Sequence, residues 1–153
     1  MLYSELHCSE AIHKAVEQMG FAEMTEIQEK TIPVMLAPTR ELAQQIADEL
    51  TALTAFMPGV AVACVYGGAN MEKQARRLAE GCQIVVATPG RLMDHYKHHS
   101  IDLSHVTQIV LDEADEMLNM GFYKDVRHII EMMKARKSLS MFSATISREV
   151  MDI

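Results

Sequence analysis

The sequence predicts an α/β fold in which one parallel β-sheet carries helices on both faces. The first observation behind this prediction is that short apolar runs alternate with longer amphipathic segments. The second is that a polar or glycine-containing motif follows each apolar run. The third is the composition, because 153 residues with 49% hydrophobic and 23% charged side chains suit one soluble domain with its own core.

Two helices are predicted before the first strand. Ser9 can cap a helix whose apolar residues share one face and which ends before Gly20. Residues 25–28, Thr-Glu-Ile-Gln, match a capping box that opens a shorter helix toward Pro33. The alternation of strands and helices begins after Pro33.

Five strands and four helices are predicted in the rest of the chain. The strands are residues 34–36, 60–66, 84–87, 109–111 and 140–142. The first helix follows Thr39 and carries Leu42, Ile46, Leu50 and Leu53, and the second lies around residues 71–78 and is closed by Gly81. The third begins at about Arg91, and the fourth carries Val126, Ile129, Ile130 and Met133. A short polar segment ends the chain.

Polar motifs follow all five predicted strands. They are residues 38–40 (Pro-Thr-Arg), 67–68 (Gly-Gly), 88–91 (Thr-Pro-Gly-Arg), 112–115 (Asp-Glu-Ala-Asp) and 143–145 (Ser-Ala-Thr). Because the carboxyl ends of parallel strands meet at one edge of a sheet, we expect these motifs to lie together there. Open α/β sheets bind their ligands at that edge.

The motifs, in this order and at this spacing, resemble those of the first RecA-like domain of the DEAD-box ATP-dependent RNA helicases. The resemblance covers essentially the whole chain. Gly20-Phe21 with Thr25 and Gln28 is similar to the Q motif, which reads adenine in that family, and Tyr3 stands where an upstream aromatic residue is usual. The resemblance implies a RecA-like, P-loop NTPase type of sheet over residues 1–153, with a Q-motif region at 1–33.

The acidic turn carries the catalytic residues that the resemblance implies. A carboxylate at a strand end can hold Mg²⁺ against ATP phosphates, the role implied for Asp112. Glu113 is implied to position and deprotonate the attacking water. Asp115 is implied to pair with Ser143 and Thr145 and to link the ATP site to strand separation. Taken alone, this turn is better explained as an exposed acidic cap of the next helix.

Gln28 and Phe21 are the implied adenine contacts. The Gln28 amide can donate to and accept from one adenine edge, and the Phe21 ring could stack on the base. Both residues also have a purely structural interpretation. Gln28 completes the capping box that begins at Thr25, and Phe21 could belong to the core.

The resemblance also implies a path for single-stranded RNA, which would be contacted through its backbone without reading of its sequence. Helix starts offer N–H groups and guanidinium groups to phosphates, and glycines allow close approach of the backbone. The implied residues are Pro38, Thr39, Arg40, Gly67, Gly68, Thr88, Gly90 and Arg91. As an alternative, Thr39 and Thr88 are ordinary helix caps and Arg40 pairs with Glu41 or other surface acids.

One part of the family's nucleotide site is missing from the sequence. No glycine is followed by lysine, so the phosphate loop G-x-x-x-x-G-K-[ST] is absent. A strand, that loop and a helix amount to at least ~30 residues, which would have to lie between Pro33 and Pro38. We expect ATP and Mg²⁺ to bind weakly or not at all. By resemblance the missing strand is central, so its loss would leave neighbouring strands unpaired or force them together.

Charge and cysteine content limit the other functions. A formal net charge of −7 means that contacts with phosphates must come from local groups. Three widely spaced cysteines predict no disulfide framework and suit a reducing cytoplasm. The sequence has no secretory signal or membrane span, so we expect a cytoplasmic monomer. His95 and His99 are four residues apart but have no evident third ligand, which favours a solvated helix end over a metal site.

Three hypotheses follow. The favoured one is a DEAD-box helicase core that has lost its phosphate loop through a natural or introduced deletion, with no ATP hydrolysis by this chain. The second is a non-catalytic RNA-binding or partner-docking module, which the net charge makes less favourable. The third is a gene fragment, or an incorrectly assembled gene, whose product folds poorly.

Overall fold

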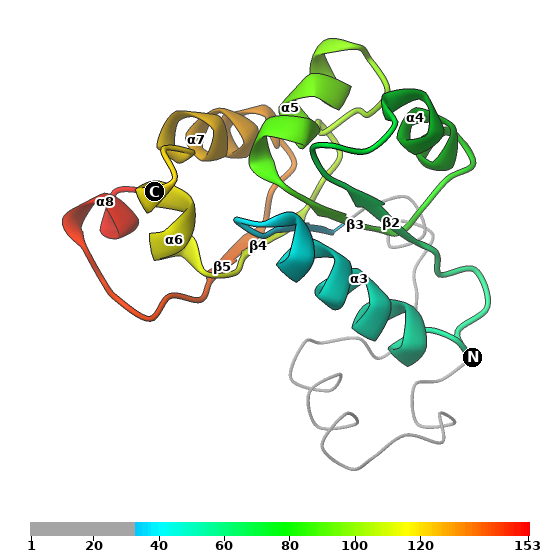
Figure 1. The fold of residues 1–153 in the computed structure, drawn as a ribbon, viewed down its shortest axis with the longest axis horizontal. Helices are drawn as coiled ribbons and strands as arrows, with labels where there is room; N and C mark the ends of the chain where they lie inside the picture. Colours follow the sequence, from blue (N-terminus) through cyan, green and yellow to red (C-terminus); the bar gives the residue numbers. More distant parts are fainter. Residues whose placement is uncertain (1–32) are drawn as a thin grey trace. The chain divides into compact units, whose positions relative to one another are not determined.

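The computed structural model describes residues 33–153 (Figure 1). The elements are β1 (Val34–Leu36), α3 (Arg40–Leu53), β2 (Val62–Val65), α4 (Met71–Ala79), β3 (Ile84–Ala87), α5 (Pro89–Lys97), β4 (Gln108–Leu111), α6 (Ala114–Asn119), α7 (Tyr123–Met132), β5 (Ser138–Met141) and α8 (Arg148–Met151). The two predicted N-terminal helices and the Q-motif region up to residue 32 lie outside the described residues.

The five strands form one parallel sheet in the order β2-β3-β1-β4-β5. The central strand, β1, pairs with β3 through Met35↔Val86 and with β4 through Met35↔Val110. Within the described residues, therefore, no strand inside the sheet is left unpaired. The loss of a central strand was expected either to leave neighbouring strands unpaired or to force them together. The pairing of β1 on both sides contradicts the first of these expectations.

Helices cover both faces of this sheet, as predicted. One face packs Ala37 and Val86 against Ala43 and Ala47 of α3, which lies along β2 and β3 (Figure 1). The other face contributes the larger core, which joins alternate residues of β1 to β4 with buried side chains from α4, α5, α6 and α7. The sheet is thus packed on both faces, and the loops that follow its strands lie at its carboxyl edge.

Several element boundaries differ from the predicted ones. The helix expected from Arg91 begins at Pro89, because proline is well tolerated in the first turn and Thr88 takes the N-cap position. The last strand begins at Ser138, two residues earlier than predicted, because it pairs with the full length of β4. The short acidic helix α6 and the terminal helix α8 were not predicted as helices. None of the described helices is long and apolar enough to cross a membrane.

Candidate functional site

The motifs that follow the strands are joined at the carboxyl edge by hydrogen bonds that continue the sheet. Ala37 N donates to Ala87 O at 3.0 Å, and Thr88 N donates to Val65 O at 3.1 Å. On the other side of β1, Asp112 N donates to Leu36 O at 2.9 Å. Phe142 N extends the series to Leu111 O at 2.8 Å. All five motifs therefore begin at one edge of the sheet, as their position after parallel strands predicted.

The start of α3 brings Arg40 beside the glycine turn. Thr39 caps the helix by accepting a hydrogen bond from Leu42 N at 3.2 Å. This cap fixes the backbone position of Arg40, the first residue of α3. The guanidinium carbon of Arg40 lies 5.4 Å from the centroid of the Tyr66 ring, a distance typical of a cation–π contact. The Tyr66 hydroxyl is held in turn by Gln44 Nε2 at 2.8 Å. An exposed arginine is thus oriented next to the end of β2.

Gly67 and Gly68 form the exposed turn that follows Tyr66. Gly68 has a φ of 81°, a left-handed conformation that side chains with a Cβ adopt at a cost. A Cβ at Gly68 would lie 3.9 Å from Nη1 of Arg40, so the turn and the guanidinium are neighbours. Gly67 has ordinary backbone geometry with open space around it. The turn therefore leaves its backbone accessible beside a positive charge.

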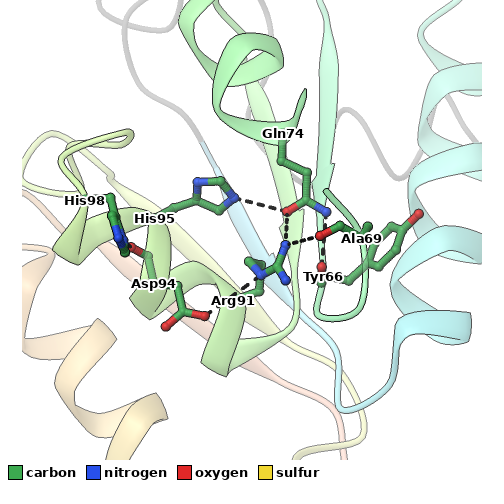
Figure 2. Close-up of polar contacts among 7 residues, drawn as sticks. All are labelled: Tyr66, Ala69, Gln74, Arg91, Asp94, His95 and His98. Carbon is green, nitrogen blue, oxygen red and sulfur yellow. Dashed lines mark hydrogen bonds and ion pairs between the residues drawn. The ribbon is translucent and has the colours of Figure 1, made fainter. Parts of the chain in front are cut away.

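Arg91, by contrast, is mostly buried in a polar network (Figure 2). Its Nη1 donates to Ala69 O at 2.9 Å and to Gln74 Oε1 at 3.1 Å, and its side chain is 13% exposed. Asp94 forms a longer ion pair with Arg91 Nε at 3.9 Å. The guanidinium expected to face RNA is therefore engaged with the protein's own backbone.

The remaining predicted RNA residues occupy the two helix starts. Pro38 and Thr88 are buried, while Thr39 and Gly90 are partly exposed. The Thr88 side chain makes no capping hydrogen bond, unlike that of Thr39. Thr39 thus has the structural role of a cap, whereas the start of α5 relies on Pro89 and on backbone geometry.

The acidic turn lies at the end of β4. Asp112 Oδ1 accepts a hydrogen bond from Glu113 N at 2.9 Å. Glu113 has a φ of 50°, which is uncommon for a residue with a side chain, and its side chain is exposed. Ala114 N donates to Phe142 O at 3.0 Å, so the turn is pinned to the segment that follows β5. Asp112 and Glu113 therefore both lie at the sheet edge, and the Asp112 carboxylate is oriented by the Glu113 N–H group.

Asp115 is joined to the Ser-Ala-Thr motif, the contact implied by the family resemblance. Its Oδ2 accepts from Thr145 Oγ1 at 2.8 Å and from Thr145 N at 3.0 Å. Ser143 Oγ accepts from Asp115 N at 3.2 Å and donates to Thr145 O at 2.7 Å. These hydrogen bonds, led by that of the Thr145 hydroxyl, lower the pKa of the Asp115 carboxyl. The ionised carboxylate therefore ties the ends of β4 and β5 together.

The described residues contain the acidic turn of a nucleotide site but no phosphate loop. Asp112 offers a carboxylate oxygen of the type that Mg²⁺ prefers, but no glycine-lysine loop stands opposite it to receive the phosphates. No group of three or more His, Cys, Asp or Glu side chains suited to a metal ion occurs in residues 33–153. The proposed adenine contacts Phe21, Thr25 and Gln28 lie outside the described residues.

Sequence reasoning missed two residues of this site, Tyr66 and Gln74. Gln74 is 7% exposed and lies on α4 between Met71 and Leu78, on the side of the helix that faces the protein. A polar residue on an otherwise apolar helix face is a signal that sequence alone could have supplied. Tyr66 was read only as the end of a strand.

Comparison with known proteins identifies the family. A family model described as DEAD/DEAH box helicase matches residues 10–153. The chain belongs to the DEAD/DEAH box helicase family. Among relatives, it is 39% identical to the ATP-dependent RNA helicase CshA of Listeria monocytogenes, over 94% of this chain and 35% of CshA. It is 48% identical to the ATP-dependent RNA helicase DeaD of Escherichia coli K12, over 76% of this chain and 19% of DeaD.

Solved structures agree with the DEAD-box assignment. A DEAD box protein from the hyperthermophile Methanococcus jannaschii superposes with a TM-score of 0.74 and 34% identity, covering 99% of this chain and 52% of that one. The parallel sheet with its helices thus matches the RecA-like domain of DEAD-box proteins. The chain spans roughly a third of the length of CshA and a fifth of that of DeaD.

The matches also reveal an internal difference in length. The CshA match runs over 183 residues but includes 94% of the 153 residues here, about 144, so about 39 of its positions have no counterpart in this chain. The DeaD match runs over 117 residues and includes 76% of the chain, about 116, and so has no such gap. A total difference of this size agrees with the at least ~30 residues that a strand, a phosphate loop and a helix require.

Proposed function

We propose that this chain contacts the backbone of single-stranded RNA as part of a DEAD-box helicase and hydrolyses no ATP on its own. The observation that carries the proposal is the convergence of two sequence-distant segments, the starts of α3 and α5, on residues 66–69. Arg40 stacks on Tyr66 beside Gly68, and Arg91 at the start of α5 holds Ala69. Helix starts, an exposed glycine turn and an arginine suit phosphates and do not read bases.

The overall charge does not oppose this function, because the relevant positive charge is local. The formal net charge is −7, yet Arg40 is exposed at the sheet edge beside a turn whose two glycines are also exposed. Attraction of this kind extends only about a Debye length, roughly 10 Å at 0.1 M salt. We therefore infer that RNA binding is weak and depends strongly on the salt concentration. We further propose that the chain acts as a cytoplasmic monomer without a membrane role.

Loss of ATP hydrolysis is the second part of the proposal. Its support is the missing phosphate loop and the length difference from CshA. Without a lysine and a backbone cradle, Asp112 would face a triphosphate with little positive charge beyond magnesium. Glu113 would then have no positioned phosphate toward which to direct a water molecule.

Fluorescence anisotropy with a labelled single-stranded oligouridylate tests the RNA contact. We expect binding at low ionic strength that weakens steeply as salt is added. Arg40→Ala should weaken it several-fold and lower the salt slope by about one unit, as expected for one lost phosphate contact. Arg76→Ala, which removes an exposed arginine in the last turn of α4, is the matched control and should change the affinity little.

Two outcomes would overturn the RNA contact. One is the absence of binding at low ionic strength by a folded chain. The other is equal loss of affinity in Arg40→Ala and Arg76→Ala, which would mean that the chain attracts RNA only through its general surface charge.

A further inference from the structure

The polar network around Gln74 connects both ends of the glycine turn to α4 and α5 (Figure 2). Gln74 Nε2 donates to Tyr66 O at 3.1 Å, immediately before the turn. Arg91 Nη1 donates to Ala69 O at 2.9 Å, immediately after it. Gln74 Oε1 accepts from the same Arg91 nitrogen at 3.1 Å. One glutamine therefore couples the two points at which the turn is fastened.

The chemistry of the partners fixes the orientation of the Gln74 amide. Arginine can only donate and a backbone carbonyl can only accept, so Oε1 must face Arg91 and Nε2 must face Tyr66 O. His95 Nε2 lies 3.1 Å from Oε1, which is then an acceptor, so this ring nitrogen must carry the proton. His95 is fully buried, and its Nε2–H group donates a hydrogen bond to the amide oxygen of Gln74.

Burial makes this arrangement costly to break. Gln74 is 7% exposed and His95 is 0% exposed, so water cannot readily replace a lost partner. A rotated amide would place its NH₂ group against the arginine and its oxygen against the Tyr66 carbonyl. The network therefore has one favourable state, and that state keeps the turn in one conformation.

We propose that Gln74, supported by His95, is a positioning residue for RNA binding: together with Arg91, it holds the Tyr66–Ala69 turn in the conformation that contacts the RNA backbone. This inference rests on the proposed function and extends it, because neither residue belongs to a motif that would touch RNA. A turn that is already ordered loses less conformational entropy when a ligand binds. Arg40 benefits as well, since its partner Tyr66 is the residue that Gln74 anchors.

Gln74→Met is the variant that tests the inference. Methionine fills a similar volume but removes the three polar contacts of the amide. The matched control is Gln83→Met, because Gln83 also holds a backbone group, accepting from Ala61 N at 2.8 Å, but lies before β3 at the opposite edge of the sheet. Both variants are measured as full-length chains at a temperature at which circular dichroism shows them to be folded.

Two readouts are needed. The first is hydrogen–deuterium exchange of the amides of residues 67–70, which reports the order of the turn without RNA. The second is the affinity for the labelled oligouridylate. We expect Gln74→Met to accelerate exchange in the turn, with the strand β1 unchanged, and to weaken RNA binding roughly tenfold, the loss expected for one or two buried hydrogen bonds. Gln83→Met should alter neither.

Different failures have different meanings. If the parent chain binds no RNA, the proposed function fails, and the exchange data alone decide whether Gln74 orders the turn. If the parent binds RNA and folded Gln74→Met binds equally well, the inference is overturned.

Should Gln74→Met not fold, Gln74→Glu replaces it. Its carboxylate still accepts from Arg91 and His95 but cannot donate to Tyr66 O, so a turn exchanging as slowly as in the parent would overturn the inference too.

Discussion

His95 illustrates how a single buried residue acquires a pH dependence. Burial lowers the pKa of its imidazole, the nearby Arg91 guanidinium and His98 lower it further, and Asp94 opposes them. Its Nδ1 atom has no hydrogen-bond partner among the described residues, so a proton added there would be buried without compensation. His95 therefore favours the neutral form in the folded state.

This lowered pKa predicts a loss of stability in mild acid. The unfolded chain takes up the proton near the ordinary histidine pKa, and the folded chain only at a lower pH. The contribution of His95 to stability is thus complete above the ordinary pKa and is lost as the pH falls through the folded-state pKa. The slope for this one group is at most about 1.4 kcal/mol per pH unit.

His95→Gln is the variant that isolates this effect, because its amide can still donate to Gln74 Oε1 but does not titrate. Urea unfolding from pH 7.5 to 5 should show a shallower decline for the variant than for the parent. Parallel declines would mean that other histidines cause the pH dependence and that His95 takes up its proton normally in the folded chain.

Among single residues, one contact that the motifs implied is present in the structure, whereas Arg91, which also belongs to a motif, is engaged with the protein itself. The contact of Asp115 with Ser143 and Thr145 was implied by the resemblance and is present in the structure. Gln74 was missed because its role depends on Arg91, 17 positions away, and on a backbone carbonyl that no motif marks. His95 was predicted to lie at a solvated helix end, which is wrong, because it is fully buried and its Nε2 atom contacts the Gln74 amide oxygen.

At the scale of elements, the Gly67–Gly68 turn shows that two adjacent glycines can have different requirements. Gly68 has a φ of 81° and Gly67 does not have a positive φ. Gly68→Ala should lower the free energy of unfolding by about 1–2 kcal/mol, the cost of a left-handed residue with a Cβ. Gly67→Ala is the control and should be nearly neutral, because nothing lies within 4 Å of the added carbon.

Chemical denaturation of the two alanine variants distinguishes the cases. Equal stability of Gly67→Ala and Gly68→Ala would show that the turn relaxes to another conformation when Gly68 is replaced. That result would also weaken the argument that Gln74 and Arg91 hold the turn in one state.

Strands and helices were predictable to different degrees. The four residues of β3 were predicted with the observed bounds, since Ile84–Ala87 is a compact apolar run that ends at a threonine and a proline. The helix predicted from about Arg91 begins at Pro89, because proline suits the first helical turn. The beginning of β5 could not be read from an apolar pattern, because its residues alternate between exposed and half-buried positions.

At the scale of the whole molecule, the described sheet accommodates the missing segment without an interior break. β1 pairs on both sides, and the core on the α5–α7 face includes residues from β1, β2, β3 and β4. This packing argues against a product that folds poorly and predicts a cooperative unfolding transition. The sequence indicated the deletion through the missing Gly-Lys pair, but not how the remaining strands would pair, because pairing order is a tertiary property.

We propose that the chain keeps an RNA contact and has lost the coupling of that contact to ATP. The most direct test of this proposal is the affinity for single-stranded oligouridylate measured with and without excess Mg²⁺ and ATP, with phosphate release followed in the same samples. We predict equal affinities and phosphate release at background. Tighter RNA binding with ATP, together with phosphate release that disappears in Glu113→Gln, would show that RNA binding is still coupled to ATP hydrolysis and would overturn the proposal.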